Sequence, residues 1–136
     1  MNEVDYKVYV EAFNRRDYGK LETFFADDFV LENVGFAVRG KSAFRKFYAF
    51  FHSYCRETVT LHKFFGGEGA FVVNANIRFE GIKDLTAAIT EEKGFSGMTP
   101  VPMGAIVDVE FLLMYELNSD GLIQHIKGAV YVPANE

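Results

Sequence analysis

The sequence contains no tryptophan, one cysteine and three prolines among its 136 residues. The single thiol, Cys55, excludes a disulfide within the chain and is typical of a reducing compartment. No uncharged stretch approaches the roughly 20 residues that a membrane-spanning helix needs. The first residues carry charges at Glu3, Asp5 and Lys7 instead of the apolar core of a signal peptide. We therefore expect a soluble, cytoplasmic protein without a membrane partner.

Basic residues are also few, because 14 Lys and Arg stand against 19 Asp and Glu, for a formal net charge of −5. A nucleic-acid-binding domain needs a basic surface that neutralises phosphates, so this balance argues against a nucleic-acid partner. The histidines are far apart, and no spacing typical of a metal site occurs. Gly66, Gly67 and Gly69 fit a turn and not a phosphate-binding loop. We expect neither a metal ion nor an organic cofactor.

Phenylalanine and tyrosine are abundant instead: 15 Phe and 7 Tyr bring the aromatic content to 16%. The length suits a single domain over residues 1–136. A small domain with so many rings has either a very bulky core or a cavity walled by aromatic side chains.

Apolar residues at helical spacing predict three helices in the first part of the chain. The first covers residues 4–16, and the second follows the capping residue Asp17 and ends at 26–28. The buried face of the second helix is expected to hold Leu21, Phe24 and Phe25. A short strand over residues 29–33 and a loop through residue 35 come next. The third helix begins at Gly40 and carries an aromatic stripe of Phe44, Phe47, Tyr48, Phe51 and Tyr54.

After Cys55 the apolar period changes to two, which predicts antiparallel strands over residues 58–65, 70–80, 105–117 and 122–132. Residues 81–103 form an irregular insert, which is either a lid over a pocket or a disordered surface excursion. Phe95 and Met98 are its candidate closing residues. Helices followed by strands indicate the α+β class. We expect a cone-shaped barrel in which three helices pack on a strongly curved antiparallel sheet around an internal apolar pocket.

Several strings match one known family in order and separation: YVEAFN at 9–14, DYGKL at 17–21, FADD at 25–28, GKSAF at 40–44 and DGLI at 120–123. With them the chain resembles the nuclear-transport-factor-2-like superfamily, and within it the branch of SnoaL-like polyketide cyclases and ketosteroid isomerases. The resemblance implies proton transfer next to a carbonyl group in a small apolar compound, without a cofactor. It also implies a homodimer formed through the outer face of the sheet. The outer face would bring Leu112 and Met114 to such an interface.

The same resemblance assigns the polar site residues. The oxyanion-hole tyrosine corresponds to Tyr9 and its supporting tyrosine to Tyr48. The two aspartates of the isomerases correspond to Asn33 and Leu113, and the cyclase aspartate corresponds to Gly128. Because none of these three residues exchanges a proton at neutral pH, the usual acids and bases are missing while the pocket framework is kept.

We predict Tyr9, Tyr48 and Asn33 as catalytic residues, since buried phenols donate strongly to a ligand oxygen and an amide can orient it. The alternatives are two core tyrosines that satisfy each other, and an asparagine that caps its own loop. The predicted pocket wall consists of Phe13, Phe25, Phe44, Phe51, Phe111, Leu113, Tyr115, Ile126 and Gly128.

The candidates for a replacement base are Asp84, His52, Asp108 and Glu110. Asp108 and Glu110 share one strand face, but that face is opposite to the apolar one, which favours a solvated position. His52 follows Tyr48 by one helical turn and could reach it, although a rim position is favoured. Two functions therefore stay open: a cofactor-independent isomerase or cyclase, and a non-catalytic ligand-binding or dimerisation module of the same fold.

Overall fold

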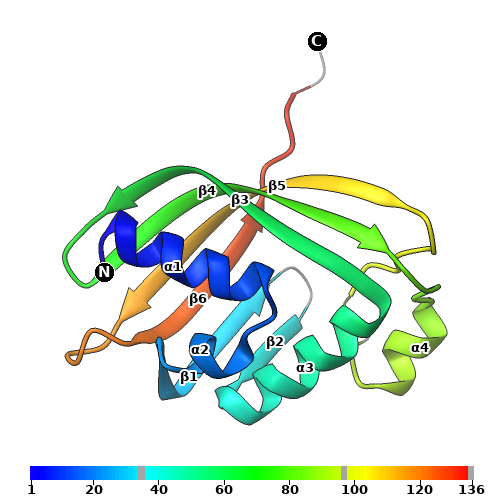
Figure 1. Ribbon diagram of the computed structural model, residues 1–136, viewed down its shortest axis with the longest axis horizontal. Coiled ribbons are helices and arrows are strands. Elements are labelled where there is room, and N and C mark those ends of the chain that lie inside the picture. Colours follow the sequence, from blue (N-terminus) through cyan, green and yellow to red (C-terminus); the bar gives the residue numbers. More distant parts are fainter. Residues whose placement is uncertain (34–35, 96–97, 135–136) are drawn as a thin grey trace.

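The computed structural model describes residues 1–33, 36–95 and 98–134. The chain forms four helices and six strands in this part, arranged as helices on one side of a single curved, open sheet (Figure 1). The elements are α1 (Glu3–Asn14), α2 (Tyr18–Glu22), β1 (Phe25–Asn33), β2 (Phe36–Arg39), α3 (Gly40–Tyr54), β3 (Cys55–Gly66), β4 (Ala70–Gly81), α4 (Ala87–Glu92), β5 (Ile106–Leu117) and β6 (Ile123–Val130). None of the helices in these ranges is long and apolar enough to cross a membrane.

The six strands are ordered β2-β1-β6-β5-β4-β3. All neighbours are antiparallel except β1 and β6, which run parallel, so the expectation of a purely antiparallel sheet is wrong at this pair. The register shifts between Leu61 and Lys63 in β3 and between Glu116 and Leu117 in β5. Such irregularities bend strands and increase their twist, which helps the sheet to curl over the helices.

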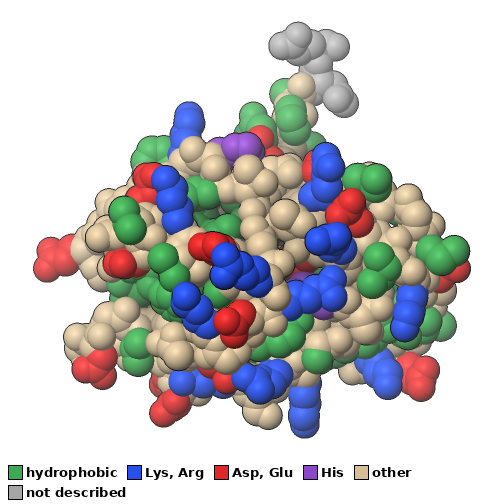
Figure 2. All heavy atoms as spheres, in the orientation of Figure 1, with side chains coloured by type: hydrophobic (Ala, Val, Ile, Leu, Met, Phe, Trp, Pro, Cys, Tyr) green, Lys and Arg blue, Asp and Glu red, His purple; other side chains and the backbone are tan. Residues whose placement is uncertain are grey.

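Local sequence signals explain the helices. Asn2 caps α1 by accepting from the Asp5 amide, and the Asp5 side chain accepts from the Asn2 amide in return. The aromatic stripe of α3 faces the sheet, and Phe44 and Phe47 are among the most deeply buried residues of the core. On the face shown in Figure 2, basic and acidic side chains are interspersed. Arg45 of α3 pairs with Glu22 of α2 at 2.8 Å between Nε and Oε1.

The segment between α2 and α3 differs most from expectation. The second helix ends at Glu22, and Phe25 opens β1, so the expected helical face of Phe24 and Phe25 is wrong. The pairing of β1 with β6 shifts between Phe25 and Val30, and this irregularity hides the period of two that would have marked a strand. The short strand β2 was not predicted, and the expected loop at residues 34–35 lies outside the described residues.

The two long central strands agree with the predicted alternation, because β4 and β5 pair over their whole length from Ala70 with Glu116 to Glu80 with Ile106. The expected irregular insert contains α4, and contacts within the insert hold its two ends together. Leu85 and Val101 form an isolated antiparallel bridge, and the Asp84 carboxylate accepts from the Met103 amide at 2.7 Å.

Candidate functional site

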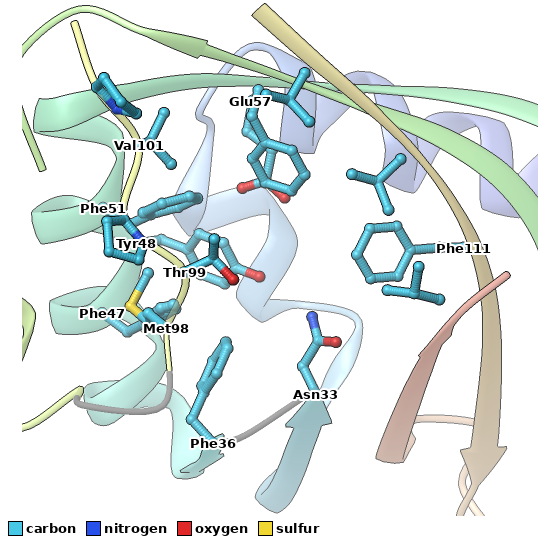
Figure 3. Close-up of a pocket in the computed structure, with 16 residues that line it drawn as sticks. Asn33, Phe36, Phe47, Tyr48, Phe51, Glu57, Met98, Thr99, Val101 and Phe111 are labelled. Carbon is cyan, nitrogen blue, oxygen red and sulfur yellow. The ribbon is translucent and has the colours of Figure 1, made fainter. Parts of the chain in front are cut away.

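Two cavities lie between the helices and the sheet. The larger one, called the main cavity, has a volume of about 250 Å³ and is enclosed by α3, the sheet and residues 98–102 (Figure 3). Its aromatic wall consists of Phe36, Phe47, Tyr48, Phe51, Phe79 and Phe111. The smaller one, called the inner cavity, has a volume of about 50 Å³. Its aromatic wall consists of Tyr6, Tyr9, Phe13, Phe44, Tyr48 and Tyr115.

Asn33, Tyr48 and Glu57 line both cavities. Figure 3 shows them pointing toward the centre of the main cavity from β1, α3 and β3. An amide, a phenol and a carboxylate therefore meet where two otherwise largely apolar spaces adjoin. This combination can hold the polar end of a ligand while the rings of the main cavity hold its apolar body.

Glu57 is the central polar group of this site. It is the third residue of β3, and its side chain points inward with the buried Cys55 while Arg56 between them is exposed. Only 9% of Glu57 is exposed. Its Oε1 atom lies 3.1 Å from Nε2 of His52, and His52 is itself only 3% exposed. A buried carboxylate needs such a partner, since desolvation otherwise strongly disfavours its charge.

The second ring nitrogen of His52 is also occupied. Nδ1 of His52 lies 2.7 Å from the hydroxyl of Tyr18, at the start of α2. Tyr18, His52 and Glu57 thus form a continuous hydrogen-bonded chain that runs from the wall of the cavities to a half-buried tyrosine. The expectation of a rim position for His52 is wrong, because the rings of Phe13, Tyr18 and Tyr48 pack against the imidazole and bury it.

The Tyr48 hydroxyl is the best-placed donor. Burial, followed by the charge of Glu57, raises its pKa well above the ordinary value, so the phenol keeps its proton at neutral pH. No group among the described residues accepts from or donates to this hydroxyl, although the same residues leave no fully buried polar side-chain atom without a partner. The hydroxyl is therefore accessible from the cavity and available to a ligand oxygen.

Tyr9 belongs to a different set of phenols. Its ring stacks on Tyr6 with centroids 5.3 Å apart, and the Tyr6 hydroxyl lies 2.7 Å from that of Tyr115. Burial raises the pKa of both Tyr6 and Tyr9. These three rings line the inner cavity, which also brings Tyr9 together with Tyr48 and Asn33, whereas Tyr9 does not line the main cavity.

The predicted pocket residues fall into three groups. Phe51 and Phe111 line the main cavity with Asn33 and Tyr48. The predicted residues that line the inner cavity are Tyr9, Phe13, Phe44, Leu113, Tyr115 and Ile126. Phe25 and Gly128 line neither of these two cavities. Phe25 stacks on Phe29 at 4.2 Å within the core, and Gly128 packs its backbone against the Asn33 side chain.

The other candidate bases lie away from both cavities. Asp108 is exposed and pairs with Arg78, and Glu110 is exposed and accepts from Asn74, as expected for the outer sheet face. Asp84 binds the Met103 amide. Sequence reasoning missed Glu57, because the strand was expected to begin at Thr58 and the inward parity was not extended to Glu57. Across residues 1–33, 36–95 and 98–134, no cluster of His, Cys, Asp and Glu is arranged to hold a metal ion.

Comparison with known proteins agrees with this architecture. The family model of the SnoaL-like domain matches residues 6–126. Comparison with curated proteins gives no match. Among solved structures, RV0760c from Mycobacterium tuberculosis, in complex with estradiol-17beta-hemisuccinate, is similar with a TM-score of 0.70 and 19% identity, covering 95% of this chain and 92% of that one.

Two enzymes show the same fold. The Delta 5-3-ketosteroid isomerase from Mycobacterium sp. has a TM-score of 0.65 and 20% identity, covering 88% of this chain and 84% of that one. An LEH-like epoxide hydrolase from M. tuberculosis has a TM-score of 0.67 and 17% identity, covering 92% and 78% respectively. At these identities the structures share the fold. Since the family model covers most of the sequence, the chain belongs to the SnoaL-like domain family.

Proposed function

We propose that this protein binds a small, uncharged carbonyl compound in the main cavity and transfers a proton at the carbon next to the carbonyl group. The observation that carries the proposal is the buried carboxylate of Glu57, which lines both cavities together with Tyr48. Glu57 replaces the aspartates that the resemblance places at Asn33, Leu113 and Gly128. The similarity to a ketosteroid isomerase supports this class of reaction.

Each group has a defined role in the proposed reaction. The Glu57 carboxylate takes the proton from the α-carbon, and the electron pair of the broken C–H bond forms an enolate. The Tyr48 hydroxyl donates a hydrogen bond to the developing enolate oxygen, in a cavity where low polarity strengthens the interaction. Asn33 orients the same oxygen from the end of β1. Return of the proton from Glu57 to the same carbon, or to a conjugated one, restores the base.

Charge and size define the ligand. Within the described residues the lining of both cavities contains Glu57 but no Lys, Arg or His, so an anionic ligand would meet a negative charge without a counterion. The volume of about 250 Å³ lies below the roughly 300–1,000 Å³ of drug-sized sites. We therefore expect compact ring ketones and enones. The steroid-derived ligand of RV0760c shows that a related fold also accepts larger rings.

We further propose that residues 81–103 cover the main cavity as a lid within a single domain over residues 1–136. Five consecutive residues of this insert, 98–102, line the cavity. Phe95 packs against Phe47 and Phe50 of α3, with ring centroids at 5.0 and 5.6 Å. Opening the lid would separate these rings and expose the cavity to water.

The test is hydrogen exchange at the α-carbon of benzylacetone, followed by proton NMR in deuterium oxide. The protein should accelerate exchange over buffer, and Glu57→Gln should reduce the acceleration by about 10²–10⁴-fold. Glu110→Gln, which neutralises an exposed carboxylate on the outer sheet face, should leave it unchanged. Exchange that is equally fast in Glu57→Gln would contradict the proposed base.

Binding is measured separately by thermal shift. Benzylacetone at 100 times its dissociation constant should stabilise the fold by about 2.7 kcal/mol. Hydrocinnamate, which has a similar shape and carries a negative charge, should give a much smaller shift. A clear shift by benzylacetone without accelerated exchange would favour the second candidate, a non-catalytic binding module.

We also propose a homodimer through the outer face of the sheet. Ile106 and Leu112 are 62% and 42% exposed on this face of β5, beside the half-buried Met114. Apolar residues interleaved with Asp108 and Glu110 match the mixed character of protein interfaces. Light scattering should give twice the chain mass, and Leu112→Glu should reduce it to that of one chain.

A further inference from the structure

The hydrogen-bonded chain that ends at Glu57 includes a residue that is not part of either cavity wall. Tyr18 of α2 lines neither cavity, yet its hydroxyl lies 2.7 Å from Nδ1 of His52. Nε2 of His52 lies 3.1 Å from the Glu57 carboxylate. The three residues come from α2, α3 and β3, so tertiary structure alone brings them together.

We propose that Tyr18 is a positioning residue for Glu57: by donating to Nδ1 of His52, it keeps the ring proton on Nε2 and directed at the carboxylate. A neutral imidazole has one N–H donor and one acceptor nitrogen, and the partner of each nitrogen decides which is which. A carboxylate only accepts, so Nε2 must donate to it. In a neutral ring Nδ1 then accepts, and the phenol is its donor. The catalytic consequence rests on the proposed function of Glu57.

The surroundings of the His52 ring restrict the hydrogen-bond partners that its two nitrogens can have. With His52 only 3% exposed, water cannot readily replace either partner. Phe13 meets the ring edge to face at 5.6 Å, and Tyr18 lies nearly parallel to it at 6.0 Å between centroids. Among the described residues, the competing acceptor for the Tyr18 hydroxyl is the Tyr48 carbonyl oxygen at 3.4 Å, which is a much weaker contact.

The charged groups nearby favour a protonated Tyr18. Burial raises the pKa of Tyr18, the charge of Arg16 lowers it, and the charge of Glu57 raises it, with a net upward shift. The phenol therefore keeps its proton at neutral pH and remains a donor. The titratable groups around the chain come from α1, the turn after it, α3 and β3; they are Tyr9, Arg16, Tyr48, Cys55 and Glu57.

Without the Tyr18 hydroxyl, the imidazole loses one of the two partners that together select its tautomer. Nδ1 can then keep the proton, and Nε2 presents a lone pair to Glu57. That arrangement is compatible only with a protonated carboxyl group, which donates to Nε2 and no longer acts as a base. The hydroxyl of a residue outside the site thus controls how much of the protein carries a competent base.

The experiment is nitrogen-15 NMR of the His52 ring in the full-length protein and in Tyr18→Phe, at neutral pH. In the unchanged protein we expect a proton on Nε2 and an Nδ1 nitrogen that accepts from Tyr18. Tyr18→Phe should move the ring signals toward the other tautomer. Tyr54→Phe, which removes a hydroxyl at the end of the same α3 helix, should leave the His52 signals in place.

A second readout follows the reaction itself. Exchange of benzylacetone by Tyr18→Phe should slow about 10-fold, as for other losses of an orienting partner. The acidic limb of its pH–rate profile should move to higher pH, while the thermal shift by benzylacetone should be kept. His52 signals that are identical in the unchanged protein and in Tyr18→Phe would overturn the proposal. A changed tautomer in a protein that does not exchange benzylacetone would support the positioning role and refute the proposed reaction.

Discussion

The hydroxyl of Tyr6, in the first turns of α1, lies 2.7 Å from the hydroxyl of Tyr115 on β5. Both side chains are buried, so one phenol donates to the other within the core. Removing one hydroxyl leaves its partner buried without this hydrogen bond, which costs about 1–3 kcal/mol. We therefore expect Tyr6→Phe and Tyr115→Phe each to lower the free energy of unfolding by about that amount, measured by urea denaturation.

Removing both hydroxyls tests whether the two act as a pair. The double variant should be less destabilised than the sum of the single ones, by about 0.5–3 kcal/mol, because neither hydroxyl of the Tyr6–Tyr115 pair is left without the other. Tyr131→Phe, at an exposed position, is the control and should leave stability within about 0.5 kcal/mol. Strict additivity of Tyr6→Phe and Tyr115→Phe would show that the two hydroxyls do not depend on each other.

How far the sequence predicts the fold depends on how regular each element is. The alternation of Phe71, Val73 and Ala75 predicts β4 because the strand pairs without a shift on its β5 side. The same reasoning fails for Phe25, since the irregular pairing of β1 with β6 places two buried residues, Phe25 and Ala26, next to each other. Periodicity is informative only where the register is continuous.

The candidate site was predictable only in part. Tyr48 follows from the aromatic stripe of α3, which any helix of that sequence would present on one face. Glu57 does not follow, since a carboxylate directly after a helix is normally solvated and its burial depends on His52 across the α3–β3 junction. The partnership with Tyr18 depends on how α2 packs on α3, which no local pattern encodes.

Asp108 on the outer sheet face pairs with Arg78, and the titration of Asp108 tests whether this contact persists in solution. Arg78 donates from Nε and Nη2 to the two oxygens of Asp108, each at 3.0 Å, and Asn76 donates to Oδ1 at 3.0 Å. The hydrogen bonds from Arg78, then that from Asn76, lower the pKa of Asp108 from 3.8 to about 2. Because the pKa is lowered by folding, the pairing stabilises the protein fully above the unfolded value and is lost as pH falls through about 2.

We expect Arg78→Gln to return the Asp108 titration toward its ordinary range, measured by carbon-13 NMR of the carboxyl group. Lys127→Gln, which removes a cation that pairs with Glu116 instead, should leave the Asp108 titration as it is. A titration of Asp108 near its ordinary value in the unchanged protein would mean that the forked contact with Arg78 does not persist in solution.

Cys55 provides a probe of the charge on Glu57. Burial, and next the charge of Glu57, raises the pKa of the Cys55 thiol from 9.0 to about 11. At pH 8 about a thousandth of the thiol is ionised, against about a tenth in the unfolded chain, so alkylation by iodoacetamide should be at least 100-fold slower in the folded protein. Because folding raises this pKa, the associated stabilisation is present below about pH 9 and declines as pH rises toward 11.

Glu57→Gln should then make Cys55 more reactive while the protein stays folded, since it removes a charge that opposes the thiolate. The rate is read by mass spectrometry, with Glu80→Gln as a comparison, because the charge of Glu80 makes the smallest contribution to the thiol pKa. If Glu57→Gln leaves the folded-state rate unchanged, the charge of Glu57 does not control the reactivity of Cys55.

Gly128 of β6 determines where Asn33 can lie. A Cβ atom at this position would stand 3.1 Å from Oδ1 of Asn33 and 3.1 Å from Cδ2 of Leu113, closer than such atoms normally approach. Gly128→Ala should therefore displace the Asn33 side chain from the wall that both cavities share. We expect a loss of about 1–3 kcal/mol in unfolding free energy, as for other overpacked sites.

The same variant should weaken the thermal shift by benzylacetone, because the displaced Asn33 amide no longer orients the ligand oxygen. Gly19→Ala is the comparison, since a Cβ there meets nothing closer than 3.8 Å, and it should raise stability by about 0.5–1 kcal/mol within α2. Should Gly128→Ala bind benzylacetone as the unchanged protein does, Asn33 can be dispensed with in binding, and recognition of the carbonyl group rests on Tyr48 alone.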